Sequence, residues 1–370
     1  MIQMRVPYFS FEHIHNTIKN SLRDAFDEVI DSDTFILGVQ LQTFEKRFSE
    51  YCSVDYTIGT GSGYDALFIG LKSLGLQPGD EVIVPAHTFV ASWHAITNAG
   101  LNIVPVDVLS DSFNLNPEHL DCAVGGKTRV VMPVHMYGQM CAMDEITDFC
   151  KTHELFCVED FAQSHGALYK GRKAGSVGDI GATSFYPVKN IGALGDGGAI
   201  TTNSTGLYNG CRRLRNYGSD EKYYYTDIGV NSRLGELQAA LLNRKILFLD
   251  QWNEQRRKIA SVYIEGLKCI EELCLPEQHK ENYHVYHLFV IMVRERDKLK
   301  KYLQNKGIET LIHYPRPPHL QEAYRYLNYK EGDFPVAERI AREALSLPCY
   351  PGLPEDHQCY IIECLLDFYK

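Results

Sequence analysis

A glycine-rich turn, GTGSGYDAL from Gly59 to Leu67, lies between a short strand-like run and a helix-like segment. Glycine lets the backbone approach a ligand closely, and a helix N-terminus presents free N–H groups to an anion. The turn therefore predicts a phosphate-binding loop, but an ordinary strand-to-helix turn without a ligand fits it equally well. The third glycine comes one residue too early for the dinucleotide-binding pattern G-x-G-x-x-G, which disfavours a Rossmann fold.

Two carboxylates, Glu159 and Asp160, end an apolar run that begins at Phe156. Proteins of the α/β class usually place their ligand sites at such strand ends. A buried carboxylate needs a cationic partner or several hydrogen bonds, and a protonated pyridine nitrogen would be such a partner. The alternative is a structural role, in which Asp160 or Ser164 caps the element that follows.

A lysine, Lys189, follows a strand-like run and a Pro turn in SFYPVKN, and a glycine-rich loop comes after it. Lysine forms Schiff bases where burial or neighbouring cations disfavour its charged form. A solvated surface lysine is the alternative. Together, a phosphate-binding loop, a carboxylate at a strand end and a lysine beyond a later strand are the parts that pyridoxal phosphate requires.

Alternating strand and helix signals position these residues. Helical spacing is found in 14–30, 41–51 and 64–74. Short apolar runs predict strands at 56–59, 81–85, 103–106, 129–134, 156–159, 183–186 and 199–202. Buried strands that alternate with helices predict an α/β fold with a largely parallel sheet.

The pattern changes after about Asn231. Long helices are expected at 234–248 and 252–267, a strand at 287–293 and another helix at 297–306. A chain of 370 residues is usually too long for one core. We therefore expect a large α/β domain over residues 1–245, which binds the cofactor, and a small C-terminal α+β domain over residues 246–370.

Composition narrows the class of protein. A formal net charge of −10 argues against a nucleic-acid binder. The eleven cysteines include no C-x-x-C pair, which argues against a zinc site, so we expect no metal. The N-terminal residues resemble no signal peptide, and no apolar run is long enough to span a membrane. Free thiols and these absences predict a cytoplasmic protein without membrane contact.

Over nearly its full length the chain resembles the DegT/StrS family of sugar aminotransferases. The resemblance is carried by PGDEVIVPAHTFVAS from Pro78, PVHMYGQ from Pro133, VEDFAQSHGALYKGR from Val158, SFYPVKNIGALGDGG from Ser184, LRNYGS from Leu214, NSRLGELQAA from Asn231, HLFVI from His287 and IHYPRPPHLQEAY from Ile312. It implies the fold type I aminotransferase architecture, with a mostly parallel seven-stranded sheet between helices in the large domain.

The same resemblance implies roles for single residues. Lys189 would bind pyridoxal 5'-phosphate covalently, and pyridoxamine 5'-phosphate would be the intermediate form of the cofactor. The other cofactor-binding positions are Asp160 at the pyridine nitrogen, Gln163 near the phenolic oxygen, Phe89 stacked on the ring, and Gly63, Tyr64 and Ser184 at the phosphate. Asn231 would reach the phosphate from a neighbouring subunit, which implies a homodimer with shared active sites.

Within the family, the chain most resembles enzymes that aminate dTDP-linked 3-keto-6-deoxyhexoses with L-glutamate. The implied product is a dTDP-3-amino-3,6-dideoxyhexose for O-antigen or another surface polysaccharide. The positions expected to meet the nucleotide sugar are Tyr186, Tyr217, Lys222, His313 and Tyr314. Some relatives replace the lysine by histidine and become dehydratases. The presence of Lys189 favours transamination.

Three alternatives remain open at this point. The first is a related aminotransferase that acts on a 4-keto sugar nucleotide. The second is a nicotinamide-dependent oxidoreductase that uses the turn at Gly59–Gly63. The third is a non-catalytic sensory or regulatory module that has kept the fold.

Overall fold

The structure, a computed structural model, describes residues 4–370, so the first three residues of the predicted large domain lie outside it. Its largest sheet has seven strands in the order β1-β9-β8-β5-β4-β2-β3. The strands are β1 (Tyr56–Thr60), β2 (Glu81–Pro85), β3 (Asn102–Val106), β4 (Thr128–Val131), β5 (Phe156–Asp160), β8 (Ile180–Ser184) and β9 (Gly198–Thr202). Only β9 runs antiparallel to its neighbours, so the predicted, largely parallel sheet is confirmed.

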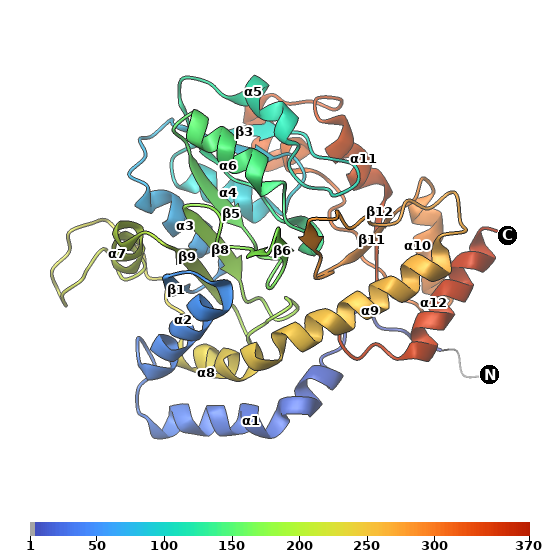
Figure 1. Cartoon of the computed structure of the whole chain (residues 1–370), viewed down its shortest axis with the longest axis horizontal. Helices are drawn as coiled ribbons and strands as arrows, with labels where there is room; N and C mark the ends of the chain where they lie inside the picture. The colour runs from blue at the N-terminus through green and yellow to red at the C-terminus, as the bar shows by residue number, and fades with distance from the viewer. Residues whose placement is uncertain (1–3) are drawn as a thin grey trace.

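Helices cover both faces of this sheet (Figure 1). They are α2 (Val39–Cys52), α3 (Gly63–Ser73), α4 (Val90–Asn98), α5 (Leu120–Ala123), α6 (Met143–Thr152), α7 (Thr205–Leu214) and α8 (Glu236–Lys245), and α1 (Glu12–Asp31) packs on the outside of α8. Because strand side chains alternate between faces, Val82 and Val84 pack in one apolar cluster with α3, α4 and α7. Ile83 lies between them in β2 and packs in the other cluster, with α2, α6 and α8.

A third apolar cluster is built by most of the C-terminal elements. These are α9 (Leu249–Leu267), β11 (Phe289–Met292), α10 (Arg296–Asn305), α11 (Pro335–Glu343), β12 (Ala344–Leu347) and α12 (Glu355–Phe368). Helix α9 runs from the neighbourhood of α8 towards α10 and α12 (Figure 1). Val6 belongs to this cluster and pairs with Ile308, so the start of the described chain packs against its end. The boundary at residue 245 stays a prediction.

Short elements complete the chain. Strands β6 (Leu168–Tyr169), β7 (Arg172–Lys173) and β10 (Asn282–Tyr283) form a small antiparallel sheet. The 3-10 helices are η1 (Pro117–His119), η2 (Met136–Gly138), η3 (Ile246–Phe248), η4 (Pro318–Leu320) and η5 (Glu322–Leu327). Within residues 4–370, no helix is long and apolar enough to cross a membrane.

Two expected strand positions were wrong by a few residues. The strand predicted at 129–134 ends at Val131, and beyond it only a parallel bridge between Val134 and Asp160 of β5 continues the pairing before the turn at η2. The strand predicted at 183–186 spans Ile180–Ser184 instead. Its last two predicted residues belong to a turn in which the Lys189 N–H donates to the Tyr186 carbonyl at 2.9 Å. In both cases the chain leaves the sheet where it begins to form the site.

Candidate active site

A cavity of about 390 Å³ opens at the carboxyl ends of β4, β5 and β8 and is closed on one side by residues 287–288 and 313–314. Most of the predicted site residues line it, namely Gly63, Tyr64, Phe89, Asp160, Gln163, Ser184, Tyr186, Lys189, His313 and Tyr314. The fold therefore brings the glycine-rich turn, the carboxylate and the lysine to one place, although the turn lies about a hundred residues or more before the other two in sequence.

The amine of Lys189 is the one cationic side chain among the described residues that line the cavity. Burial lowers the pKa of Lys189 from 10.5 to about 8, and the negative charge of Asp160 opposes the shift. Near pH 7 about a tenth of the amine is therefore neutral, a far larger fraction than for a lysine with the ordinary pKa of 10.5. A neutral amine is the form that attacks a carbonyl, so the environment suits covalent attachment of an aldehyde.

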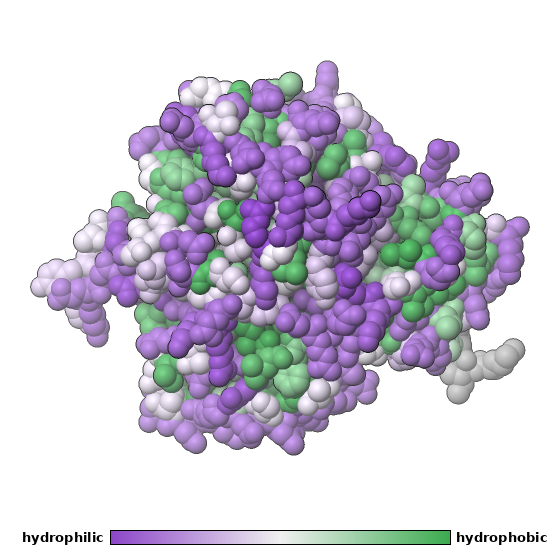
Figure 2. Space-filling view, viewed as in Figure 1, coloured by the Kyte–Doolittle hydropathy of each residue, from purple (hydrophilic) through white to green (hydrophobic). Residues whose placement is uncertain are grey.

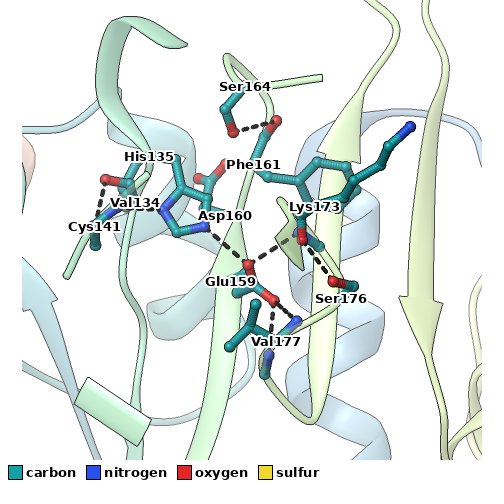
Figure 3. Close-up of polar contacts among 12 residues, drawn as sticks. Val134, His135, Cys141, Glu159, Asp160, Phe161, Ser164, Lys173, Ser176 and Val177 are labelled. Carbon is teal, nitrogen blue, oxygen red and sulfur yellow. Dashed lines mark hydrogen bonds and ion pairs between the residues drawn. The ribbon is translucent and has the colours of Figure 1, made fainter. Parts of the chain in front are cut away.

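The two neighbouring carboxylates on β5 have different roles. Glu159 accepts hydrogen bonds from His135 at 2.9 Å and from the backbone N–H groups of Gly175, Val177 and Gly178 at 3.0, 2.7 and 2.7 Å (Figure 3). Burial by itself would raise the pKa of Glu159, but these hydrogen bonds lower it below its usual value. Glu159 thus fastens the loop at 175–178 to the sheet and does not line the cavity.

Of the two carboxylates on β5, Asp160 is the one that lines the cavity, and Asp196 lines it as well. Its Oδ2 accepts a hydrogen bond from the Ser92 hydroxyl at 2.9 Å, and its Oδ1 accepts one from the Ala162 N–H at 3.2 Å. Burial raises the pKa of Asp160, while these two hydrogen bonds and Lys189 oppose the rise. A cation placed beside this carboxylate would lower its pKa and stabilise its charge. The protonated nitrogen of a pyridine ring is a cation of that kind.

The N-terminus of α3 lies at one end of the cavity, where the sequence predicts the binding of a phosphate. Ser62 caps the helix, and its hydroxyl accepts the Asp65 N–H at 3.1 Å, which leaves the first N–H groups of the helix directed outwards. A Cβ added at Gly63 would come within 2.5 Å of the Ser184 Cβ. Glycine is therefore required for α3 to approach the end of β8, where Ser184 adds its hydroxyl.

An aromatic pair forms the opposite wall. Phe89 is 52% exposed and faces Tyr314 with 5.4 Å between ring centroids. The position leaves one face of the Phe89 ring free to stack on a flat ligand. Gln163 lies beside them, and its Nε2 donates to the Tyr314 hydroxyl at 3.2 Å. Phe89, Gln163 and Asp160 would thus contact different parts of the same planar ring.

The histidines at the cavity are neutral. His313 bonds to the Ser346 hydroxyl at 2.8 Å, and burial together with the charge of Lys189 lowers the pKa of His313 to about 4. His287 bonds to the side chain of Asn190 at 3.0 Å, and burial lowers its pKa well below the usual value. Neither histidine supplies a positive charge to the cavity near neutral pH.

Three predicted residues, Tyr217, Lys222 and Asn231, do not line the cavity of their own chain. They lie on or beside the segment after α7, which projects from the body of the molecule (Figure 1). Tyr217 is 49% exposed, and the ammonium of Lys222 lies over the exposed Tyr223 ring. Asn231 is predicted to act from a neighbouring subunit, and the roles of all three residues stay predictions.

Sequence reasoning missed two residues of the site. Ser92 holds Asp160 in place, and His287 lines the cavity opposite the strand ends. Both stand inside segments that carry the family resemblance, PAHTFVAS and HLFVI. No spacing rule singles them out, because their partners lie elsewhere in the chain.

The described residues fit pyridoxal phosphate. The close approach at Gly63 and Ser184, the carboxylate of Asp160 and the lowered pKa of Lys189 match the phosphate, the ring nitrogen and the aldehyde of that cofactor. None of these features indicates a nicotinamide dinucleotide as the cofactor.

Comparison with known proteins agrees with this geometry. The family model described as the DegT/DnrJ/EryC1/StrS aminotransferase family matches residues 16–366. The chain is 42% identical to a pleiotropic regulatory protein of Geobacillus stearothermophilus, with 99% of both chains covered. It is 41% identical to the dTDP-3-amino-3,6-dideoxy-alpha-D-galactopyranose transaminase of Aneurinibacillus thermoaerophilus, over 97% of this chain and 98% of the relative.

A solved structure extends the likeness to three dimensions. The crystal structure of DesV from S. venezuelae in complex with a ketimine intermediate superposes with a TM-score of 0.97 and 41% identity, covering 99% of both chains. The predicted aminotransferase fold is therefore confirmed, and the oxidoreductase alternative is wrong. The cofactor of the chain is pyridoxal phosphate, as the resemblance implied.

Proposed function

The chain belongs to the DegT/DnrJ/EryC1/StrS aminotransferase family, and we propose that it transfers the amino group of L-glutamate to a dTDP-linked 3-keto-6-deoxyhexose. The products are 2-oxoglutarate and a dTDP-3-amino-3,6-dideoxyhexose. The observation that carries the proposal is the single cavity in which Lys189, Asp160 and the N-terminus of α3 meet. The Aneurinibacillus relative, a dTDP-3-amino-3,6-dideoxy-alpha-D-galactopyranose transaminase, supports a 3-amino product.

Bound pyridoxal phosphate supplies a carbonyl that accepts an amine and a ring that withdraws electrons from the reacting carbon. The chain supplies the rest. The first N–H groups of α3 and the Ser184 hydroxyl bind the phosphate, and Asp160 keeps the ring nitrogen protonated. Lys189 would hold the cofactor and, as a neutral amine, would move a proton at the reacting carbon.

The position of the new amine tests the proposal. The purified protein is incubated with L-glutamate and either the 3-keto or the 4-keto form of a dTDP-6-deoxyhexose, and NMR of the product locates the nitrogen. We expect amination at carbon 3. Turnover only at carbon 4 would overturn the choice of sugar but not of reaction. Absence of the glutamate half-reaction would overturn the aminotransferase assignment as well.

We propose further that the active unit is a homodimer with shared sites. Apolar side chains are exposed on and after α1, where Phe26, Ile30, Phe35, Ile36 and Val39 have 46, 51, 53, 49 and 63% of their surface exposed. Figure 2 shows a mostly hydrophilic surface that is interrupted by smaller apolar areas. Contact with a second copy would bury the α1 residues. It would also bring Tyr217, Lys222 and Asn231 to the partner's cavity.

A charge argument favours the shared site. The phosphate of the cofactor, the carboxylates of glutamate and the diphosphate of the sugar nucleotide are all anionic. Among the described lining residues, Lys189 alone is cationic. Lys222 of a second copy would add a positive charge where one is needed.

The eleven cysteines are all free thiols, which supports the predicted cytoplasmic location. Use of the product in a surface polysaccharide stays a prediction.

A further inference from the structure

Tyr137, in the segment PVHMYGQ, joins both walls of the cavity although it does not line it. It is buried, and its backbone has a left-handed φ of 58°, which residues other than glycine rarely adopt. Its N–H donates to the Gln163 Oε1 at 2.7 Å, and its carbonyl accepts the Leu288 N–H at 3.2 Å. Its hydroxyl donates to the backbone carbonyl of His313.

These contacts close a ring of hydrogen bonds. Tyr137 bonds to Gln163, Gln163 to the Tyr314 hydroxyl at 3.2 Å, and the neighbouring His313 carbonyl bonds back to the Tyr137 hydroxyl. The ring connects the turn after β4, the turn after β5 and the segment at 313–314. Three chain segments that are distant in sequence are thereby held at fixed positions around the cavity.

The chemistry of the partners settles where the hydrogens lie. A carbonyl only accepts, so the Tyr137 hydroxyl donates to His313 and accepts from the Nε2–H of His87 at 2.7 Å. Burial lowers the pKa of His87 to about 3, so this imidazole is neutral. The Gln163 oxygen must face the Tyr137 N–H, which makes its amide nitrogen the donor to Tyr314. The Tyr314 hydroxyl therefore accepts within the ring, and its own hydrogen is left to donate.

We propose that Tyr137 is a positioning residue, which acts through this ring to keep the Tyr314 hydroxyl aimed as a hydrogen-bond donor into the cavity. The acceptor is an oxygen of the bound substrate, and in the first half-reaction it is a carboxylate of glutamate. A neutral donor has a large effect here, because the described lining residues offer one cationic side chain, which is also the reacting amine. The inference rests on the aminotransferase activity and not on the identity of the sugar.

A double-mutant cycle tests it. Wild type, Tyr137→Phe, Tyr314→Phe and the double variant are compared as holoenzymes in the glutamate half-reaction, followed by the absorbance of the cofactor in single turnovers. Tyr263→Phe is the matched control, because this buried hydroxyl also donates to a backbone carbonyl, that of Pro348 at 2.8 Å, in the C-terminal cluster. Amide hydrogen exchange of residues 309–316 is measured in parallel on the cofactor-free proteins.

We expect each single variant at the ring to lower kcat/KM for glutamate by about tenfold. The double variant should be no slower than Tyr314→Phe, because Tyr137 acts only through Tyr314. Exchange at 309–316 should be faster in Tyr137→Phe and unchanged in Tyr263→Phe.

Independent losses that multiply in the double variant would overturn the inference, and so would unchanged exchange at 309–316 in Tyr137→Phe. The same holds if Tyr263→Phe slows the half-reaction as much as Tyr137→Phe does. Failure of the 3-keto sugar to react would contradict the proposed substrate. It would not affect the double-mutant cycle, because that experiment needs only glutamate.

Discussion

At the residue scale, the reactivity of the site depends on the opposed effects of burial and of one neighbouring charge. Burial favours the neutral amine of Lys189, and the carboxylate of Asp160 favours the ammonium form. The first effect is larger, so the pKa of Lys189 is about 8. Glu159, adjacent in sequence, has no such influence in the cavity because His135 and the backbone of the loop at 175–178 bind it.

The rate at which the cofactor-free protein binds pyridoxal phosphate covalently should follow the neutral fraction of Lys189. The pKa of the lysine is lowered to about 8, so the rate should rise with pH up to about 8 and level off above it. Stopped-flow absorbance between pH 6 and pH 10 measures the rate of covalent cofactor binding. A rate that still rises tenfold per pH unit at the alkaline end would contradict the lowered pKa.

Replacing Asp160 by Asn should change two measurements in predictable directions. Loss of the carboxylate removes the charge that keeps the ring nitrogen protonated, so the glutamate half-reaction should slow by about a hundredfold or more. Loss of the same charge should also move the midpoint for cofactor attachment below that of wild type, because Asp160 raises the pKa of Lys189. An upward shift of the midpoint would contradict the arrangement. Ser92→Ala, which removes one hydrogen bond and no charge, is the milder control.

At the element scale, the position of α3 against the end of β8 determines the phosphate-binding end of the cavity. Gly63→Ala should weaken binding of the cofactor and lower the free energy of unfolding by about 1–3 kcal/mol, because the added methyl group would overlap Ser184. Gly210→Ala in α7 is the control, since its nearest neighbour would be the Ser73 Cβ at 3.6 Å. Equal loss of cofactor affinity in both variants would show that the close approach at Gly63 is unimportant.

A second element, the C-terminal end of α8, supports the loop after Lys189. The buried Lys245 ammonium donates to the Gly192 carbonyl at 2.6 Å, and burial lowers the pKa of Lys245 to about 8. The unfolded chain therefore binds this proton more tightly than the folded one. Stability contributed by this group rises as the pH increases from about 8 towards the unfolded pKa of 10.5.

Lys245→Met should remove that part of the pH dependence. Urea unfolding of the cofactor-free protein at pH 8 and pH 10 gives the difference in stability, which should be smaller in the variant by about 2 kcal/mol. Because both proteins contain the other groups that titrate in this range, the contributions of those groups to the pH dependence of stability cancel in the comparison. The same pH dependence in both would mean that Lys245 has an ordinary pKa in the fold.

At the scale of the whole molecule, the proposed homodimer predicts complementation between inactive chains. Lys189→Ala lacks the reacting amine, and Asn231→Ala lacks the predicted partner contribution to the phosphate. Mixed, reassociated chains should recover about a quarter of the wild-type sites, because half of the dimers are mixed and each has one intact site. Light scattering confirms the assembly. Activity no higher than the sum of the separate variants would contradict shared sites.

The substitution Ile30→Glu on α1 is expected to give monomers without activity. Burying a charge in the proposed subunit contact costs several kcal/mol, whereas in the isolated chain this side chain is half exposed. Size-exclusion chromatography with light scattering measures the change. Val262→Glu on α9, at a similarly exposed apolar residue, is the control and should leave the assembly intact. A dimeric Ile30→Glu protein would place the contact elsewhere.

The sequence by itself determined the sheet, the reaction class and most of the predicted residues that line the cavity, because strand and helix periodicity and the motifs around Asp160 and Lys189 are local patterns. Only the tertiary structure decided what depends on distant partners. It separated Asp160 from Glu159, set the pKa of Lys189 and placed Ser92, His287 and Tyr137 at or behind the cavity. Burial and hydrogen bonding between remote segments leave no periodic trace in a sequence, so these features emerge only when the chain is folded.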